Sequence, residues 1–293
     1  MKIVSYKSIV KRSCCALIII ALLEIVFRML LIFPVYDADA AVGYWIRPNQ
    51  KGSYLLRNDW VFNDQSMGVG QLFRGTRNFD LLLVGDSVVL GGNPLQQRDK
   101  LGPTLARNTG WSVWPLSAGS WAMQNELVFI QRHSGILKQV DAVAFVFNSG
   151  DFGVPSSWAS EITHPRSYPR SYLWYAIRKC CFKPNTVPPK GLLVTPRDPL
   201  EMWDAFNAQS KIPVIAIAYS QLDESGDSCN WVPLSFRKTG NWFCYRDLRP
   251  DAGRAYRDGV HPTRTGDERL AEFISSATRS YMAIKMPARS SVP

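Results

Sequence analysis

The feature that most constrains the fold is a series of short, largely apolar segments that alternate with segments of helical pattern. The first, Leu81-Leu-Leu-Val84, has no polar residue and runs directly into Gly85, which is typical of a strand buried on both faces. Continuous apolar strands separated by helices indicate a parallel sheet that helices cover on both sides. We expect strands at 81–84, 112–116, 142–147 and 212–219, and helices at 101–108, 123–136, 199–208 and 265–282.

Two motifs stand where such a sheet places functional groups. Gly85-Asp86-Ser87 leaves a serine at the carboxyl end of the first strand, where open α/β sheets carry their sites. Asp258-Gly-Val-His261-Pro-Thr places a carboxylate and an imidazole three residues apart, just before the last helix. Together the motifs offer a nucleophile, a base and a group that orients the base.

A serine hydroxyl is a poor nucleophile until a base takes its proton, and histidine, whose ordinary pKa is near neutrality, suits that task. We predict His261 as the general base and Asp258 as the group that holds its tautomer. Taken alone, the Asp-Gly pair could be an ordinary turn, and His-Pro-Thr could cap the next helix. Their combination with Ser87 favours the catalytic interpretation.

The two motifs resemble those of the SGNH hydrolases, also called the GDSL family of esterases, over roughly residues 76–285. The resemblance, which is to membrane-anchored bacterial members, implies a flavodoxin-like three-layer α/β/α sandwich with a central, mostly parallel sheet. It implies Ser87, Asp258 and His261 as catalytic residues of an acyl-enzyme mechanism that needs neither a metal nor a cofactor.

The resemblance also implies an oxyanion hole made by the N–H groups of Ser87 and Gly119 and by an asparagine side chain. In the family the third block usually reads Gly-x-Asn-Asp, whereas this chain has Asn148-Ser-Gly150-Asp151. The asparagine is therefore displaced by two residues. If Asn148 could not reach the hole, one donor would be lost, at about 3 kcal/mol of transition-state stabilisation.

The N-terminus carries Lys2, Lys7, Lys11 and Arg12 before an apolar stretch that ends at Phe33. Such a stretch can just span a bilayer, and its basic flank favours a cytoplasmic N-terminus. We predict a cytoplasmic segment at 1–12 and a single-pass signal anchor at 13–33, in which Glu24 and Arg28 can pair. The alternative is a signal peptide cleaved after Ala38-Asp-Ala40. Both place the catalytic domain outside the cytoplasm, in a periplasmic or extracytoplasmic compartment.

The remaining chain divides into a connecting region at 34–75, the hydrolase domain at 76–285 and a tail at 286–293. Residues 152–196 are rich in proline and aromatic residues and interrupt the alternation of strands and helices. This insertion is either a surface excursion with one short helix near 172–179 or a lid that forms a wall of the substrate site.

Four cysteines fall in the exported part, where an oxidising compartment permits disulfides. Cys180, Cys181, Cys229 and Cys244 allow three pairings, and the sequence does not choose among them, although Cys229 and Cys244 could close one loop. Because the chain has only three histidines and no zinc-like Cys/His spacing, we expect no metal site.

The formal net charge of +10 fits either a solvated basic surface or attraction to an anionic partner. No nucleic-acid motif is present. We predict an exported serine esterase that removes acyl groups, O-acetyl groups first among them, from a cell-envelope or secreted polysaccharide. One alternative is an O-acetyltransferase with the same site, which would need a multi-span partner to bring the acyl donor across the membrane. Another is a non-catalytic polysaccharide-binding or assembly module with the same fold.

Overall fold

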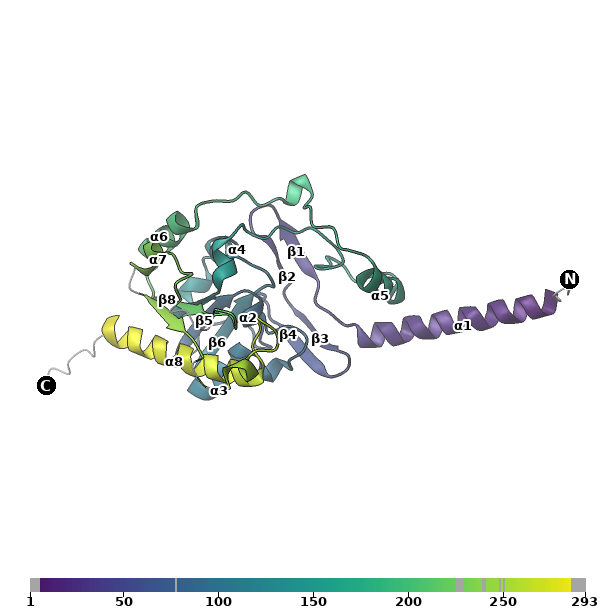
Figure 1. Cartoon of the computed structure of the whole chain (residues 1–293), viewed down its shortest axis with the longest axis horizontal. Coiled ribbons are helices and arrows are strands. Elements are labelled where there is room, and N and C mark those ends of the chain that lie inside the picture. The colour runs from purple at the N-terminus through teal and green to yellow at the C-terminus, as the bar shows by residue number, and fades with distance from the viewer. Residues whose placement is uncertain are drawn as a thin grey trace.

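Five parallel strands form the centre of the computed structural model, which describes residues 6–285 except 77, 225–228, 239–240, 248 and 250 (Figure 1). The strand order is β6-β5-β7-β8-β9, and every neighbouring pair is parallel. The strands are β5 (Asp80–Gly85), β6 (Ser112–Ser117), β7 (Ala142–Phe147), β8 (Val214–Tyr219) and β9 (Trp242–Tyr245). The four predicted strands are confirmed, and β9 is an edge strand that the sequence pattern did not predict.

Helices cover both faces of this sheet, as continuous apolar strands require. Leu81 and Leu83 of β5 belong to the core under α3 (Leu101–Thr109) and α8 (Arg264–Lys285). Leu82 and Val84, which point the other way, belong to the core under α4 (Met123–Arg132) and α6 (Pro199–Gln209). The molecule therefore has the expected three layers (Figure 1).

The predicted helix at 123–136 is shorter than expected. It ends at Arg132, since Ser134 and Gly135 are poor helix formers, and the chain continues in a separate turn, η2 (Ile136–Lys138). The other short elements are α2 (Ser87–Leu90), η1 (Gln97–Asp99), η3 (Ser149–Phe152), η4 (Lys190–Leu192), α7 (Leu234–Arg237) and η5 (Ala252–Ala255).

The predicted connecting region consists of two antiparallel hairpins. They are β1 (Tyr36–Asp39) with β2 (Gly43–Ile46), and β3 (Gln50–Tyr54) with β4 (Asn58–Phe62). The hairpins pack on the α/β layers: the Tyr44 hydroxyl donates to the Gly119 carbonyl at 2.7 Å, and Met67 pairs with Leu116 at the edge of β6.

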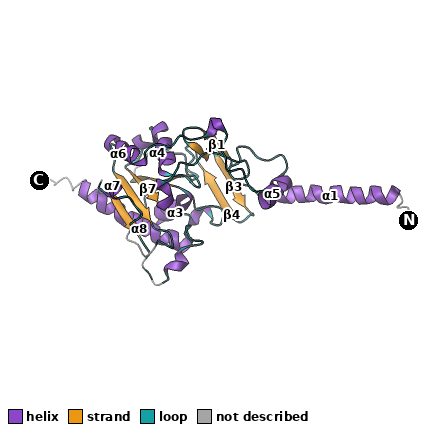
Figure 2. Ribbon diagram, turned by 45° about the horizontal axis from the view of Figure 1, so that its top comes forward, coloured by secondary structure: helices purple, strands orange, loops and turns teal. Residues whose placement is uncertain are grey.

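The insertion holds one helix, α5 (Tyr172–Cys181), close to where a short helix is predicted. It packs beside the C-terminal end of α1 (Tyr6–Leu30), which extends away from the layers (Figure 2). Within the described residues, one segment, Val10–Leu30, is long and apolar enough to cross a membrane. The N-terminal residues 1–5 and the predicted tail at 286–293 lie outside the described residues.

The structure resolves the cysteine pairing that the sequence left open. Cys229 and Cys244 form a disulfide that closes the loop leading into β9. Cys180 and Cys181, at the end of α5, are exposed thiols.

Candidate active site

Three neighbouring strands end at the same edge of the sheet, and each leads into a predicted site residue. β5 leads to Ser87, β6 to Gly119 and β7 to Asn148. The chain passes from β5 to β6 on one side and later returns to β7 on the other side of β5. Ser87 therefore lies at the topological switch point, where open parallel sheets place their ligands.

The turn that presents Ser87 depends on two residues before it. A Cβ atom on Gly85 would lie 2.4 Å from Val89 Cγ2 and 3.2 Å from the Val146 carbonyl oxygen, so only glycine allows this close approach. Asp86 then caps α2 by accepting the Val88 N–H at 2.8 Å. As a result, Ser87 occupies the first position of a one-turn helix directly beyond the strand.

The structure brings the three predicted catalytic side chains together. His261 Nε2 lies 2.9 Å from Ser87 Oγ, and His261 Nδ1 lies 2.9 Å from Asp258 Oδ2 and 3.0 Å from Oδ1. The loop is held from its own backbone, because the Arg257 N–H donates to the His261 carbonyl at 2.8 Å. This is the geometry in which an imidazole can take a proton from serine while a carboxylate fixes its tautomer.

Local hydrogen bonds keep Asp258 charged. Its partial burial acts to raise the pKa, but the N–H groups of His261 and Val260 donate to Oδ1 at 2.7 and 3.0 Å. Together with the imidazole, these donors lower the pKa of Asp258 to about 2. The carboxylate is therefore ionised throughout the range in which an esterase would work.

Asn148 is buried at the end of β7, and its side chain is directed toward the nucleophile turn. Its Nδ2 donates to Asp86 Oδ2 at 3.0 Å, and its Oδ1 accepts the Gly150 N–H at 2.9 Å. A primary amide has two N–H groups, so one bond to Asp86 leaves a second donor available. Thus, despite its displacement in sequence, Asn148 lies next to the residue that precedes Ser87.

Gly119 could contribute to an oxyanion hole through its backbone N–H, whereas Asn148 would do so through its side chain. Its carbonyl is held by Tyr44, whereas the N–H makes no hydrogen bond to a described residue. Nothing lies within 4 Å of the position that a Cβ atom would occupy there, so the space beside the backbone is open.

Three buried carboxyl groups lie behind the turn. They belong to Asp86, Glu126 on α4 and Asp151 in η3, and burial raises the pKa of each. Asp151 accepts the Asn148 N–H at 2.6 Å, whereas neither carboxyl oxygen of Glu126 has a partner among the described residues. Glu126 was not predicted from the sequence. Its position among the apolar residues of the helix at 123–132 was the one feature that could have indicated a buried glutamate.

The remaining histidines have structural surroundings. His133 stacks on Phe129 at 4.1 Å between ring centroids, and His164 packs against Tyr44 at 4.0 Å. Burial, together with the nearby Lys179 ammonium, lowers the pKa of His164 to about 4. Neither ring contacts Ser87.

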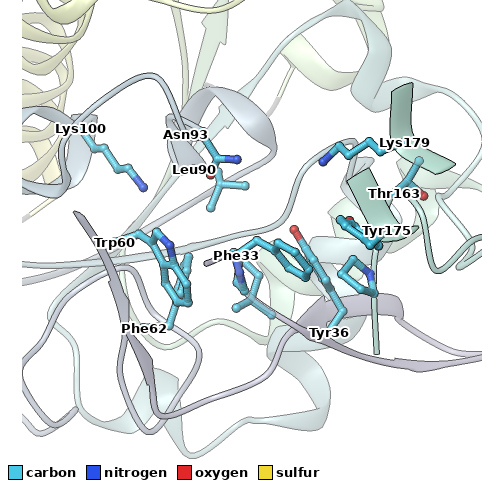
Figure 3. A pocket seen from close by; sticks show the side chains of 14 residues that line it. Phe33, Tyr36, Trp60, Phe62, Leu90, Asn93, Lys100, Thr163, Tyr175 and Lys179 are labelled. Carbon is cyan, nitrogen blue, oxygen red and sulfur yellow. The ribbon is translucent and has the colours of Figure 1, made fainter. Parts of the chain in front are cut away.

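A pocket lies beyond the far end of α2 (Figure 3). Its floor is aromatic and comes from the segment just after α1 and from the hairpins, with Phe33, Tyr36, Trp60 and Phe62. Leu90, the last residue of α2, forms part of the opposite wall. The predicted connecting region thus contributes a cavity next to the nucleophile helix, which no local sequence pattern indicated.

No family model and no curated protein matches the chain. Among solved structures it resembles a G-D-S-L family lipolytic protein from Desulfitobacterium hafniense, with 13% identity, a TM-score of 0.40 and coverage of 68% of this chain and 99% of that one. It also resembles a family two carbohydrate esterase from Clostridium thermocellum crystallised with cellohexaose, with 10% identity, a TM-score of 0.41 and coverage of 74% and 66%.

Proposed function

We propose that this chain is an exported serine esterase of the SGNH type that works through an acyl-enzyme. The observation that carries the proposal is the continuous chain of contacts from Asp258 through His261 to Ser87, with 2.9 Å at each step. The three residues come from opposite ends of the domain sequence, and the Asn148 side chain contacts Asp86, the residue before Ser87.

In the proposed reaction, His261 Nε2 takes the Ser87 proton as Oγ attacks the ester carbonyl. The Ser87 and Gly119 N–H groups and the Asn148 amide stabilise the oxyanion. His261 then returns the proton to the leaving alcohol, which leaves an acylated Ser87. A water molecule, deprotonated by the same imidazole, releases the acid and restores the serine.

The substrate that we propose is an acylated polysaccharide of the cell envelope or the secreted matrix, with O-acetyl groups as the acyl groups removed. An exported domain tethered by α1 would meet such polymers, and the aromatic pocket beside α2 offers ring faces to a sugar. If an acetylated donor transferred its acyl group to an added oligosaccharide faster than to water, the chain would instead be an O-acetyltransferase.

The test is covalent labelling of the full chain with a fluorophosphonate, followed by mass spectrometry and by assays on an aryl acetate and an acetylated oligosaccharide. We expect a single label on Ser87 and no turnover by Ser87→Ala. Ser112→Ala is a matched control, because this serine lies at the opposite end of β6. Retention of more than about a tenth of the activity by Ser87→Ala would refute the nucleophile assignment.

A further inference from the structure

The aromatic pocket beside α2 contains two lysines that approach it from opposite ends, Lys100 and Lys179 (Figure 3). Lys179 is exposed at the rim, whereas Lys100 is only 6% exposed. None of the residues that line the pocket is acidic. The Lys100 ammonium makes no hydrogen bond and no ion pair within 4.0 Å to any residue that the structure describes.

An ammonium on a largely buried side chain is costly to keep charged when no acceptor lies within hydrogen-bond distance. Burial lowers the pKa of Lys100 to about 8, against the attraction of the buried Asp267. Asp267 also interacts electrostatically with Arg257, so its charge is shared between Arg257 and Lys100. Lys100 therefore stays largely charged at neutral pH and would gain from an anion placed in the pocket.

The rest of the lining selects the kind of anion. The Trp60 Nε1 donates to the Ile32 carbonyl at 3.0 Å, so the indole presents its ring rather than a free donor. Together with Phe62 and Tyr36 it makes an apolar floor of aromatic rings, whose faces suit the C–H face of a sugar ring. The cavity volume of about 90 Å³ exceeds the 10–15 Å³ that one water needs, and it suits a charged substituent with part of its ring.

The pocket adjoins the nucleophile through α2. Ser87 begins that helix and Leu90 ends it, so three residues, a rise of about 4.5 Å, separate the two positions along the axis. Arg257, beside Asp258, donates to the Gly91 carbonyl at 3.3 Å and thereby ties the triad loop to the pocket wall. A polymer bound with an ester at Ser87 would reach the pocket with a neighbouring sugar.

We propose that Lys100 binds the carboxylate or phosphate of an acidic sugar that lies next to the ester-bearing sugar, and that Lys179 at the opposite rim adds positive potential to the pocket. The role of this subsite in turnover rests on the proposed function, whereas its binding can be measured without turnover. The substrate would then be an anionic rather than a neutral polysaccharide.

The experiment is calorimetric titration of full-chain Ser87→Ala in detergent with an unesterified oligogalacturonide, compared with a neutral xylo-oligosaccharide. We expect only the acidic oligomer to bind, and Lys100→Met to weaken binding tenfold or more. Lys100→Met keeps the volume of the buried side chain and should fold. Lys179→Met, at the exposed rim, gives a second variant with a several-fold loss, and the exposed Lys190→Met is the control.

Equal binding of the two oligomers, or unchanged binding in both pocket variants, would overturn the subsite. Displacement of the oligogalacturonide by a sugar phosphate would support the shared anion chemistry. Binding of phosphatidylglycerol vesicles at Lys100 without any binding of oligogalacturonide would overturn the sugar assignment. If the pocket binds as expected but the wild type takes no fluorophosphonate, the esterase proposal fails and the binding site stands.

A second inference rests on a different part of the molecule, an apolar collar around the C-terminal end of α1. Its side chains are between 39% and 59% exposed. They come from the last turns of α1, the tip of the β3–β4 hairpin and the outer side of the α5 region. The collar consists of Ile25, Val26, Met29, Leu55, Leu56, Tyr168, Trp174, Ile177 and Phe182.

Polar contacts fix the three parts of the collar to one another. The Glu24 carboxylate caps α5, because it accepts the N–H groups of Tyr172 and Leu173 at 2.9 and 3.0 Å. Arg28 pairs with Glu24 at 2.9 Å, as the sequence predicts. On the other side, the Leu55 N–H donates to the Leu30 carbonyl at 2.8 Å. The collar is therefore a built surface around the candidate span.

The backbone at the tip of the β3–β4 hairpin also points to an apolar environment. Leu55 and Leu56 both adopt a left-handed backbone, with φ of 54° each. This conformation costs a leucine about 1–2 kcal/mol, and water-facing hairpin tips normally use glycine or asparagine there. Two exposed leucines at such a tip indicate an apolar surrounding.

The surroundings and the length of α1 identify that environment. Exposed cations stand within a few residues of the collar in sequence, among them Lys51, Arg57, Arg170, Arg178 and Lys183. From Arg12 to Glu24 the helix rises only about 18 Å, less than the roughly 30 Å of a bilayer core. A helix that crosses a bilayer from Arg12 therefore needs the turns beyond Glu24 as well, and these turns lie beside α5.

We propose that the collar docks on the outer leaflet of an anionic bilayer that α1 crosses, with α5 lying in the interface. Aromatic and cationic side chains of this kind suit the headgroup region. The aromatic pocket, whose lining includes Phe33 and Tyr175, would then open close to the membrane surface.

The test uses the full chain, with its free cysteines replaced by serine, in phosphatidylglycerol-containing vesicles. A nitroxide on Ile177→Cys should be more accessible to oxygen than to a water-soluble nickel chelate, and so should one on Leu56→Cys. Leu234→Cys on α7, an exposed leucine outside the collar, is the control and should show the reverse. Water-like accessibility at both collar sites would overturn the docking.

Discussion

Two kinds of carboxyl group lie near Ser87, and they differ in what surrounds them: Asp258 is exposed, whereas the buried set consists of Asp86, Glu126 and Asp151. The Asp258 side chain is 53% exposed, yet its pKa is only about 2 because backbone and imidazole N–H groups donate to it. Asp86, Glu126 and Asp151 are no more than 6% exposed, and burial raises the pKa of each. Donor number and burial, rather than residue type, therefore decide in which direction each pKa moves.

The difference bears on how the serine is presented. Its Oγ lies 2.9 Å from His261 Nε2 and 3.3 Å from Asp86 Oδ2, so two acceptors compete for one proton. A fully ionised Asp86 would draw the hydroxyl away from the imidazole and would oppose an oxyanion beside it. Burial raises the pKa of Asp86 and so acts in the direction that weakens this competition, whereas the donors around Asp258 lower its pKa to about 2.

The largest effect on turnover should come from removing the charge of the exposed Asp258. Asp258→Asn replaces an acceptor by a group that can also donate, so His261 would adopt the wrong tautomer. We expect kcat to fall by about 10³–10⁴-fold with the fold intact. The measurement is kcat on an aryl acetate, with circular dichroism as the control for folding. A loss of less than tenfold would mean that something other than Asp258 orients the imidazole.

The next largest effect on turnover should come from Asn148, whose side chain donates to Asp86. If its free amide N–H donates to the oxyanion, Asn148→Ala should lower kcat by about a hundredfold and change KM little. If Asn148 only satisfies Asp86 and Gly150, the variant should lose thermal stability and keep its kcat. The kcat and the melting temperature together distinguish these outcomes. A stable variant with near-native kcat would refute the oxyanion role.

Asp86 should show a smaller effect, because it acts by positioning. Asp86→Asn can still accept the Val88 N–H but cannot accept from Asn148 without a rearrangement. We expect kcat to fall by about tenfold, and the loss to be smaller in an Asn148→Ala background because the two residues act through one contact. Fully additive losses would show that Asp86 acts on Ser87 independently of Asn148.

The sequence predicted the parts of this site that local pattern determines. A wholly apolar run before Gly85-Asp86-Ser87 indicates a buried strand and a tight turn, and the carboxyl ends of parallel strands must meet. The short spacing between Asp258 and His261 likewise favours their contact. The catalytic roles of these residues remain predictions that the assays above test.

The parts that the sequence missed depend on contacts between distant segments. β9, at a sheet edge, has only four residues, so its apolar run is too short to distinguish it from the loop before it. Glu24 was assigned only its partner Arg28, because nothing local shows that α5 begins against it. Glu126 was overlooked because a glutamate in an amphipathic helix normally faces water.

The smallest effect should come from the buried Glu126, and it concerns the stability of the fold rather than turnover. The raised pKa of Glu126 means that the folded chain holds a proton that the unfolded chain releases above about pH 4.3. Stability is therefore lost as the pH rises from that value toward the folded-state pKa. Glu126→Gln removes this loss, so it should raise the melting temperature at pH 8 by about 2–4 °C for each kcal/mol regained, and leave it unchanged at pH 4. The exposed Glu272→Gln should shift it by little at either pH. Equal effects of Glu126→Gln at both pH values would show that this carboxyl does not titrate as burial requires.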